Sequence, residues 1–226
     1  MNQSVEQNRK VIVEKSLSIC QILTSLVNLG VKNHEDYLSM IKIGEYSADS
    51  IKDKTAKMNA QCRANANAYE PKLTGELEVV EAAGRAMENA EVITDAELSS
   101  ALAIIESLQG VLPFGVEESL VSTFAGNQKA LRIIIGAIQR YGKKTPTLDR
   151  FIFEIDYKMT SLRGHVSLIT SDPYNNGADI IGMRRDLINL NKLIGADVPE
   201  ESFSLGDNYD ALSNARFRKA AGLPAK

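Results

Sequence analysis

Basic side chains at helical spacing are the feature of this sequence that best fits a binding role. The basic members are Lys129, Arg132, Arg140 and Lys143, with Gly136 in the same row, so that a member recurs every three or four residues, and Lys144 extends the row. That spacing places the cations along one face of a helix, opposite an apolar face. A row of cations attracts an acidic protein surface or the phosphates of a nucleic acid. The alternatives are a solvated helix face and internal ion pairs with an acidic helix.

A second basic cluster lies near the C-terminus, where an amphipathic helix is expected to begin at Asp207 or Asn208. The cluster comprises Arg216, Arg218 and Lys219. Terminal amphipathic helices dock onto partners in some proteins and cover their own core in others. The net charge of the chain is −3, and the face that carries the first basic series has no interleaved aromatic residue, since Tyr141 is expected on the apolar face. A protein partner is therefore favoured over nucleic acid.

Metal binding and nucleophilic catalysis find little support in the sequence. The two histidines are His34 and His165, and neither has a second ligand at a spacing that metal sites use. Ser161 and Ser167 lie near His165 in sequence, but such proximity is not the geometry of a catalytic triad. We therefore expect His165 to be a polar residue on an amphipathic helix. We expect no metal, no cofactor and no catalytic residue.

Two further patterns have simpler structural explanations. Gly177 and Gly182 have the spacing of a phosphate-binding loop, but Met183 and Arg184 stand where that loop carries lysine and a hydroxyl. We expect a glycine turn followed by a helix there. A row of acidic residues lies along one helix face and comprises Glu78, Glu81, Glu88, Glu91 and Asp95. Because these acids share one environment, they fit a solvated surface better than an acid–base pair.

The cysteines and the N-terminal sequence bear on the cellular compartment. Cys20 and Cys62 lie in apolar or alanine-rich segments without paired spacing, as expected for buried thiols in a reducing compartment. Glu14 and Lys15 interrupt the first apolar run, and residues 16–31 are too short and too polar to span a bilayer. These features predict a cytoplasmic protein, in a host cell or a virion, that does not bind membranes.

Apolar residues seven positions apart place the first expected helix at the N-terminus. The row comprises Val5, Ile12, Ile19 and Leu26. Gly30 is expected to end this helix. Asn33 is then expected to cap a second helix that runs to about Gly44.

Residues 46–90 carry two narrow apolar stripes on either side of Pro71. The first stripe comprises Ile51, Thr55, Met58, Cys62 and Tyr69, and the second comprises Leu73, Leu77, Val80, Gly84 and Met87. Since a proline disfavours helix in the residue before it, we expect a turn and an antiparallel helical hairpin. Ala66, Ala68 and the asparagines near them would then face outward as a low-charge assembly surface. The alternative is a hairpin that lies on the protein's own core.

Signals for helix ends and loops organise the second half of the chain. Thr94–Glu97 has the pattern of a capping box. Asn127 is expected to cap a helix that ends at Gly142 and buries Leu131, Ile134, Ile135 and Ile138. The glycine- and proline-containing loop at 110–116 is the expected boundary between two regions. These regions are residues 1–110, which include the hairpin, and residues 116–226, unless both form one domain.

Residues 151–170 fit two structures. Apolar and polar residues alternate from Phe151 to Thr160, which is the periodicity of a strand, and His165–Thr170 could pair with it. The same segment also places a row of apolar residues on one helical face: Ile152, Ile155, Met159, Leu162, Val166 and Ile169. We favour the helix because it leaves fewer apolar side chains exposed.

The sequence therefore predicts an all-α, multi-helix bundle with a protruding antiparallel helical hairpin. The alternative is an α+β fold with a small β-hairpin at 151–170. The predicted function is that of a non-enzymatic structural or protein-interaction protein that acts by assembly with its own copies or a protein partner. Alanine- and asparagine-rich helices suggest a component of a viral particle or a scaffold. The alternative is a nucleic-acid-associated regulator that uses the basic helix face and the basic C-terminal helix.

Overall fold

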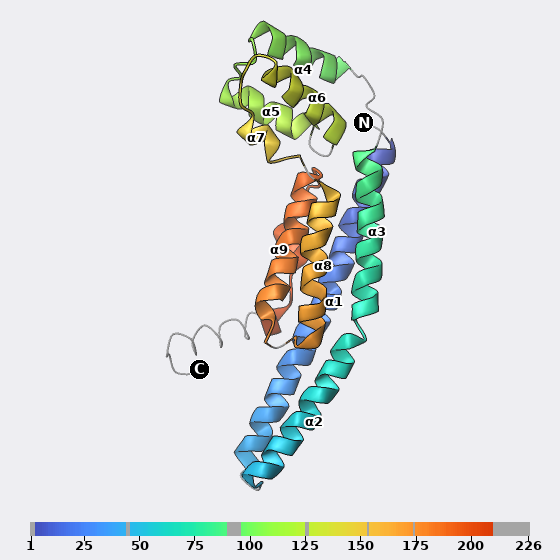
Figure 1. Cartoon of the computed structure of the whole chain (residues 1–226), viewed down its shortest axis with the longest axis vertical. Coiled ribbons are helices and arrows are strands. Elements are labelled where there is room, and N and C mark those ends of the chain that lie inside the picture. The colour runs from blue at the N-terminus through green and yellow to red at the C-terminus, as the bar shows by residue number, and fades with distance from the viewer. Residues whose placement is uncertain are drawn as a thin grey trace. The chain divides into compact units, whose positions relative to one another are not determined.

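The computed structural model describes residues 3–43, 46–89, 96–124, 127–152, 154–173 and 175–209. Every regular element in these ranges is a helix (Figure 1). The α-helices are α1 (Gln3–Ile43), α2 (Ala48–Asn67), α3 (Glu70–Glu88), α4 (Ala96–Ser107), α5 (Phe114–Phe124), α6 (Gln128–Gln139), α7 (Pro146–Asp149), α8 (Ile155–Ser171) and α9 (Gly177–Leu193), and a 3-10 helix covers Glu200–Phe203. The all-α class is confirmed. Thr94, Asp95 and the basic C-terminal cluster lie outside the described residues.

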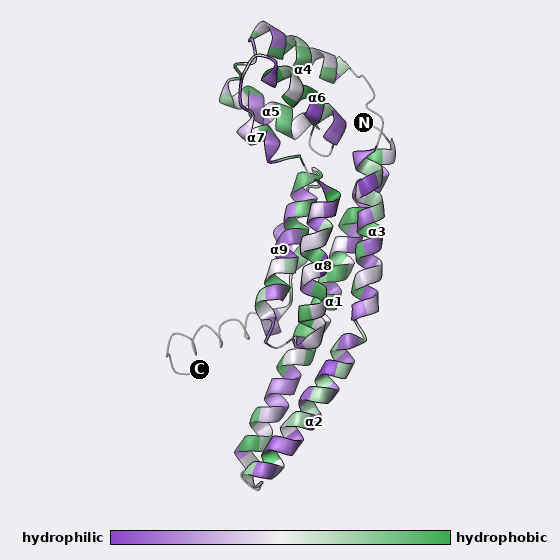
Figure 2. Ribbon diagram, in the orientation of Figure 1, coloured by the Kyte–Doolittle hydropathy of each residue, from purple (hydrophilic) through white to green (hydrophobic). Residues whose placement is uncertain are grey.

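The helices form two compact units, each assembled from three separate stretches of chain. Unit 1 comprises Met1–Lys15, Glu78–Thr160 and Leu187–Pro199, whereas unit 2 comprises Ser16–Leu77, Ser161–Asp186 and Glu200–Lys226. Helices α1, α3, α8 and α9 contribute residues to both units. The loop at 110–116 lies within unit 1. Figure 2 shows polar and apolar residues interspersed along the helices, as expected for amphipathic elements.

Helix α1 is continuous, which corrects the expected stop at Gly30 and new start at Asn33. The buried face extends past Gly30 and includes Ile12, Ile19, Leu23, Leu26, Val27 and Met40. A glycine inside a helix costs about 1 kcal/mol relative to alanine, less than the burial of two or three such side chains contributes. Asn33 does not cap a helix; its side-chain amide donates to Asn59 Oδ1 at 3.0 Å.

Among the described helices, α1 is the one that meets the length and hydropathy criteria for a membrane span. An 18-residue window within Ser4–Lys42 has a mean hydropathy of 1.2, and 39% of that window is buried inside the protein. A core helix of a soluble protein meets the same criteria. Ile12, Ile19 and Leu23 are completely buried within the chain's own packing, and this burial accounts for part of the apolar character of α1.

Helices α2 and α3 cover the region of the expected hairpin, but they are not an antiparallel pair. Ala68 between them keeps a right-handed helical backbone (φ −64°, ψ −15°), so the chain continues without reversing (Figure 1). Pro71 lies in the first turn of α3, where the missing N–H costs nothing. In unit 2, α2 lies beside the C-terminal half of α1, to which the hydrogen bond of Asn59 joins it. The antiparallel partner of α2 is therefore α1.

The helical alternative for residues 151–170 is confirmed from Ile155 onward, while Phe151 and Ile152 belong to a turn. The buried face of α8 contains Ile155, Met159, Leu162, Val166 and Ile169, as the helical pattern predicts. Glu88 Oε1 accepts a hydrogen bond from the backbone N–H of Ile155 at 2.8 Å. A carboxylate at a helix N-terminus satisfies a free N–H and opposes the positive end of the helix dipole, so it favours the helix over a strand.

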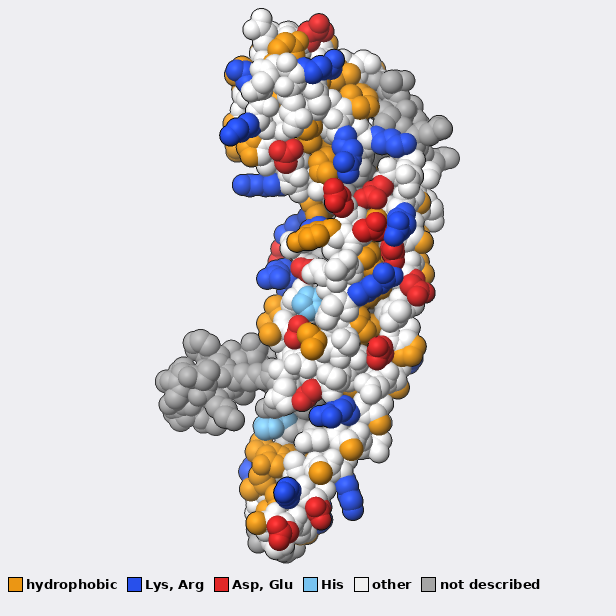
Figure 3. Space-filling model, in the orientation of Figure 1, with side chains coloured by type: hydrophobic (Ala, Val, Ile, Leu, Met, Phe, Trp, Pro, Cys, Tyr) orange, Lys and Arg blue, Asp and Glu red, His pale blue; other side chains and the backbone are white. Residues whose placement is uncertain are grey.

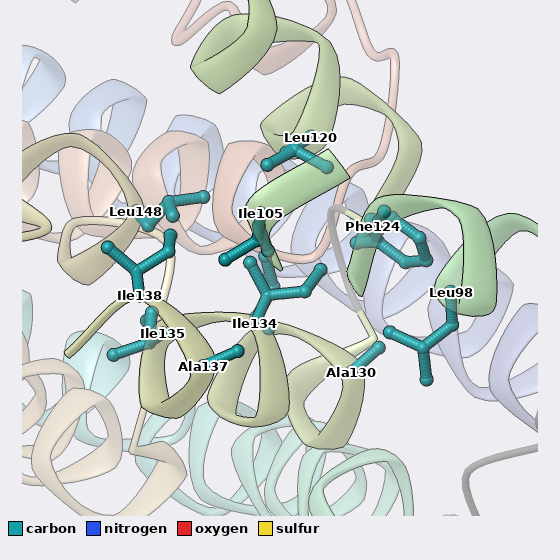
Figure 4. Packing of buried hydrophobic residues seen from close by; sticks show 12 residues of the cluster. Leu98, Ile105, Leu120, Phe124, Ala130, Ile134, Ile135, Ala137, Ile138 and Leu148 are labelled. Carbon is teal, nitrogen blue, oxygen red and sulfur yellow. The ribbon is translucent and has the colours of Figure 1, made fainter. Parts of the chain in front are cut away.

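Within unit 1, helices α4 to α7 enclose a hydrophobic core (Figure 4). Its buried members are Leu98, Ala101, Ile105, Leu120, Phe124, Ala130, Leu131, Ile134, Ile135, Ala137, Ile138 and Leu148. Gly110 ends the α4 segment with a left-handed backbone (φ 72°) and lies against Tyr141: an added Cβ would be 2.9 Å from Tyr141 Cβ. This contact brings the loop after α4 to the C-terminal end of α6.

Candidate functional site

Helix α6 positions the basic series that the sequence singles out. Asn127 Oδ1 accepts a hydrogen bond from the amide of Ala130 at 3.1 Å, which confirms the predicted N-cap. Leu131, Ile134 and Ile138 are at most 2% exposed and hold one face of α6 in the core. The opposite face is therefore turned toward solvent.

The structure separates the basic series into exposed and half-buried members. Arg132 and Arg140 are exposed at α6 and its C-cap, while Lys143 and Lys144 are exposed in the loop that follows. The helix thus ends at Gln139, before the last two lysines that the spacing assigned to it. Lys129 is half-buried, and its Nζ donates to the backbone carbonyl of Asn89 at 3.1 Å. Four exposed cations remain, and we call Arg132, Arg140, Lys143 and Lys144 the α6 basic surface.

Ion pairing within the described part of the chain does not account for these four cations. Within the described residues, no carboxylate forms an ion pair with any of the four. Arg9 pairs with Glu6, Arg85 pairs with Glu81, and Arg184 donates to backbone carbonyls. Internal pairing with the acidic helix therefore does not use the α6 basic surface in the described part of the chain.

Exposed apolar side chains lie in the loop after α4, at the start of α5 and at the C-terminal end of α6. Val111 is 58% exposed, Phe114 is 72% exposed and Tyr141 is 41% exposed. The contact between Gly110 and Tyr141 holds the start of the α4–α5 loop beside the C-terminal end of α6. Figure 3 shows Lys and Arg side chains with hydrophobic side chains between them on the face of α4–α7 that it presents. We call Val111, Phe114 and Tyr141 the apolar patch.

Sequence analysis does not identify this apolar patch. The segment GVLPFGV marks a loop by its glycines and proline, which does not reveal that Val111 and Phe114 are solvent-exposed while Leu112 and Val116 pack against the core. A phenylalanine and a valine in a loop are a signal in themselves, because exposed apolar patches mark interaction surfaces. Only the packing of Gly110 against Tyr141 shows that this loop starts beside the C-terminal end of α6, where the basic series continues.

The acidic row is not simply a solvated face. Glu81 accepts from Arg85 at 2.8 Å, and Arg85 also pairs with Asp156 at 2.7 Å. Glu88 binds the N-terminus of α8, as described above. At least these two glutamates therefore stabilise contacts within unit 1; Glu91 and Asp95 lie outside the described residues.

His165 belongs to a polar cluster between α8 and α9 in unit 2. Its Nδ1 lies 3.0 Å from Asp179 Oδ1, and its Nε2 lies 3.8 Å from Asp186 Oδ2. Ser161 Oγ donates its hydrogen bond to Asp186 at 2.5 Å and not to His165. A serine nucleophile needs its hydroxyl directed at a base that can take the proton onward, as imidazole does. The cluster joins α8 to α9, and it does not direct the Ser161 hydroxyl at the imidazole of His165.

The remaining candidates also have a structural place. Gly177 begins α9, and Gly182 lies inside it beneath His165, where an added Cβ would be 2.7 Å from the imidazole Cε1. The glycine spacing thus serves helix packing. Burial raises the pKa of Cys20 to about 12, against a smaller opposing effect of Arg184, and burial likewise raises the pKa of Cys62. Both thiols are buried, as predicted.

The proposed assembly surface on α2 requires a correction. Ala66, which the hairpin hypothesis turned outward, is completely buried. Asn59, Asn65, Asn67 and Ala68 are exposed as expected, but Asn59 is bonded to Asn33 and Asn65 to Gln61. Assembly through the remaining outward face of α2 stays a prediction.

Comparisons with known proteins give no relative from which a role could be transferred. No family model, no curated protein and no solved structure matches this chain. Within the described residues, no group of three or more histidine, cysteine or acidic side chains is arranged to hold a metal ion. The proposals below are therefore based on geometry alone.

Proposed function

We propose that this chain is a non-enzymatic protein-interaction protein that binds an acidic protein partner through the α6 basic surface and the adjacent apolar patch. The observation that carries the proposal is the combination of four exposed cations that pair with no described carboxylate and three exposed apolar side chains, of which Tyr141 lies at the C-terminal end of α6 and Val111 follows the glycine that contacts Tyr141. Apolar anchors supply affinity in protein interfaces, and surrounding charges supply orientation and speed of association. This surface has both components.

A protein partner explains the apolar patch better than a nucleic acid does. Val111 is aliphatic and Phe114 begins α5, so Tyr141 is the one aromatic side chain of the patch that lies among the cations in sequence. Single-stranded nucleic acids are bound by aromatic side chains that stack on successive bases along a basic groove. An acidic segment with apolar side chains would match both the charge and the patch.

A direct binding comparison tests the proposal. Fluorescence anisotropy would measure binding of the full chain to a labelled peptide in which glutamates alternate with leucine and phenylalanine. A second probe would be a labelled single-stranded DNA of equal charge. We expect the peptide to bind more tightly. DNA that binds more tightly, with a steep fall of log affinity against log salt, would favour the nucleic-acid regulator instead.

Charge-reversal variants assign the binding to the surface. The variant R132E/R140E should bind the acidic peptide at least about tenfold more weakly, because two favourable contacts become repulsive. The matched control K52E/K57E changes the net charge equally, at two exposed lysines of α2 in unit 2. It should retain nearly full binding. Equal loss in both variants would show that net charge, not this surface, attracts the peptide.

A further inference from the structure

A hollow in unit 2, separate from the α6 basic surface, is lined by polar side chains from α1, α2 and the loop after α8. It has a volume of about 200 Å³. Its walls include Tyr37 of α1, Thr55, Asn59 and Arg63 of α2, and Asp172 in the loop. A volume of this order admits a small molecule or a single charged group but not a protein segment.

Thr55 contributes a buried hydroxyl that no described residue binds. Its Oγ1 is buried and has no hydrogen-bond partner among the described residues. Hydroxyls within helices ordinarily donate to the carbonyl four residues earlier, as those of Thr24, Thr160 and Thr170 do here. Because a buried polar group without a partner is unfavourable, the hydroxyl of Thr55 has a donor to offer a molecule in the hollow.

The other polar groups of the hollow are mostly donors. Within the described residues, the Arg63 guanidinium and the Tyr37 hydroxyl have no hydrogen-bond partner. Asn59 uses its carbonyl oxygen to accept from Asn33, which leaves its NH₂ group available. The carboxylate of Asp172 accepts from the backbone N–H and the side-chain amide of Asn175, so its two oxygens are engaged. The free groups thus match an acceptor-rich ligand, and the positive charge of Arg63 offsets the negative charge that Asp172 keeps in the wall.

Cys62 does not alter this balance. The thiol lies in the wall of the hollow, and burial, with a smaller contribution from Asp172, raises its pKa. The thiol is therefore neutral at physiological pH and brings no negative charge that would repel an anion.

We propose that the hollow binds the oxyanion group of a small molecule, a phosphate or a carboxylate, with Arg63 as the charged anchor and Thr55, Tyr37 and Asn59 as neutral donors. Arg63 supplies a planar array of donors that matches either group. The neutral donors select an acceptor-rich group. This site does not depend on the proposed protein-binding surface.

The test uses the full, isotope-labelled chain and two probes, inorganic phosphate and acetate. Backbone amide shifts in two-dimensional NMR would be followed as each salt is added at constant ionic strength, with sodium chloride as the reference. This reference is needed because phosphate stabilises folded proteins without binding to a site. The variants are R63Q, T55V and the control R150Q, which removes an exposed arginine of unit 1.

We expect saturable shifts at residues 55–63 and 171–173 with one or both probes, and the stronger probe identifies the ligand class. R63Q should weaken binding at least about tenfold, whereas R150Q should leave it unchanged. T55V should weaken binding and raise the stability of the free protein, because it removes a hydroxyl without a protein partner. Absence of saturable shifts with both probes, or equal shifts in R63Q, overturns the proposal.

Discussion

The thiol of Cys20 makes stability depend on alkaline pH. Cys20 is 2% exposed in α1, and burial raises its pKa from the ordinary value of 9.0 to about 12. The folded chain therefore holds this proton more tightly than the unfolded chain. The contribution is fully present below pH 9 and is lost as pH rises from 9 toward 12. The slope approaches 1.36 kcal/mol per pH unit, which amounts to about 1.4 kcal/mol at pH 10.

The variant C20A isolates this effect, because the other titrating groups are common to both proteins. Urea unfolding of both proteins at pH 7, 8, 9 and 10 would give their free energies of unfolding. C20A should be less stable at pH 7 because it leaves a small cavity. The difference should then shrink by about 1.4 kcal/mol by pH 10. A difference that stays constant with pH would refute the burial of this thiol in the folded chain.

Three further outcomes follow from packing. I134A in the core of unit 1 should lower the free energy of unfolding by about 2–5 kcal/mol. A loss of less than about 1 kcal/mol in urea unfolding would contradict the burial of Ile134 in that core. G84A should destabilise the protein by about 1–3 kcal/mol, because the added Cβ would lie 2.5 Å from Ile155 Cδ1. The control G75A places its Cβ where nothing lies within 4 Å, and it should stabilise the protein by about 0.4–1 kcal/mol. Equal effects of the two variants in thermal unfolding would refute the contact between Gly84 and Ile155. If α2 mediates assembly, light scattering should give the wild-type protein a mass above the 24.7 kDa of the monomer. The variant N67K/A68K should have a lower mass than the wild type. A wild-type protein that is monomeric at high concentration would reject assembly through α2.

Helical periodicity predicts the elements whose buried faces are broad. The apolar rows of α6 and α8 identify their buried faces correctly, because a side chain's position on a helix depends only on local geometry. Asn127 is likewise predictable as an N-cap, since its hydrogen bond closes within three residues.

Predictions that depend on distant contacts are less successful. Gly30 resembles a helix stop, but the packing of residues on both sides of it keeps α1 continuous. Pro71 resembles a hairpin turn, but a proline is equally suited to the first turn of a following helix. The residues next to Pro71 do not determine whether the chain turns back there, because the antiparallel partner of α2 is a segment of α1 more than twenty residues away in sequence.

The candidate sites likewise combine features that local sequence predicts with features that depend on distant contacts. The basic series is visible in the sequence as spacing, whereas the apolar patch depends on a contact between Gly110 and Tyr141. The histidine cluster combines Ser161 and His165 of α8 with acids of α9, and the oxyanion hollow combines three segments. Such groupings arise from tertiary structure and leave no pattern of spacing along the chain.

The most direct measurement of the central claim is a two-dimensional NMR titration of the labelled chain with the acidic, leucine- and phenylalanine-containing peptide. The account predicts amide shifts concentrated at residues 108–114 and 132–144, where the apolar patch and the α6 basic surface lie. It also predicts that these shifts disappear in R132E/R140E and persist in K52E/K57E. Shifts located elsewhere in the chain, or unchanged in R132E/R140E, would contradict a protein-binding role for this surface.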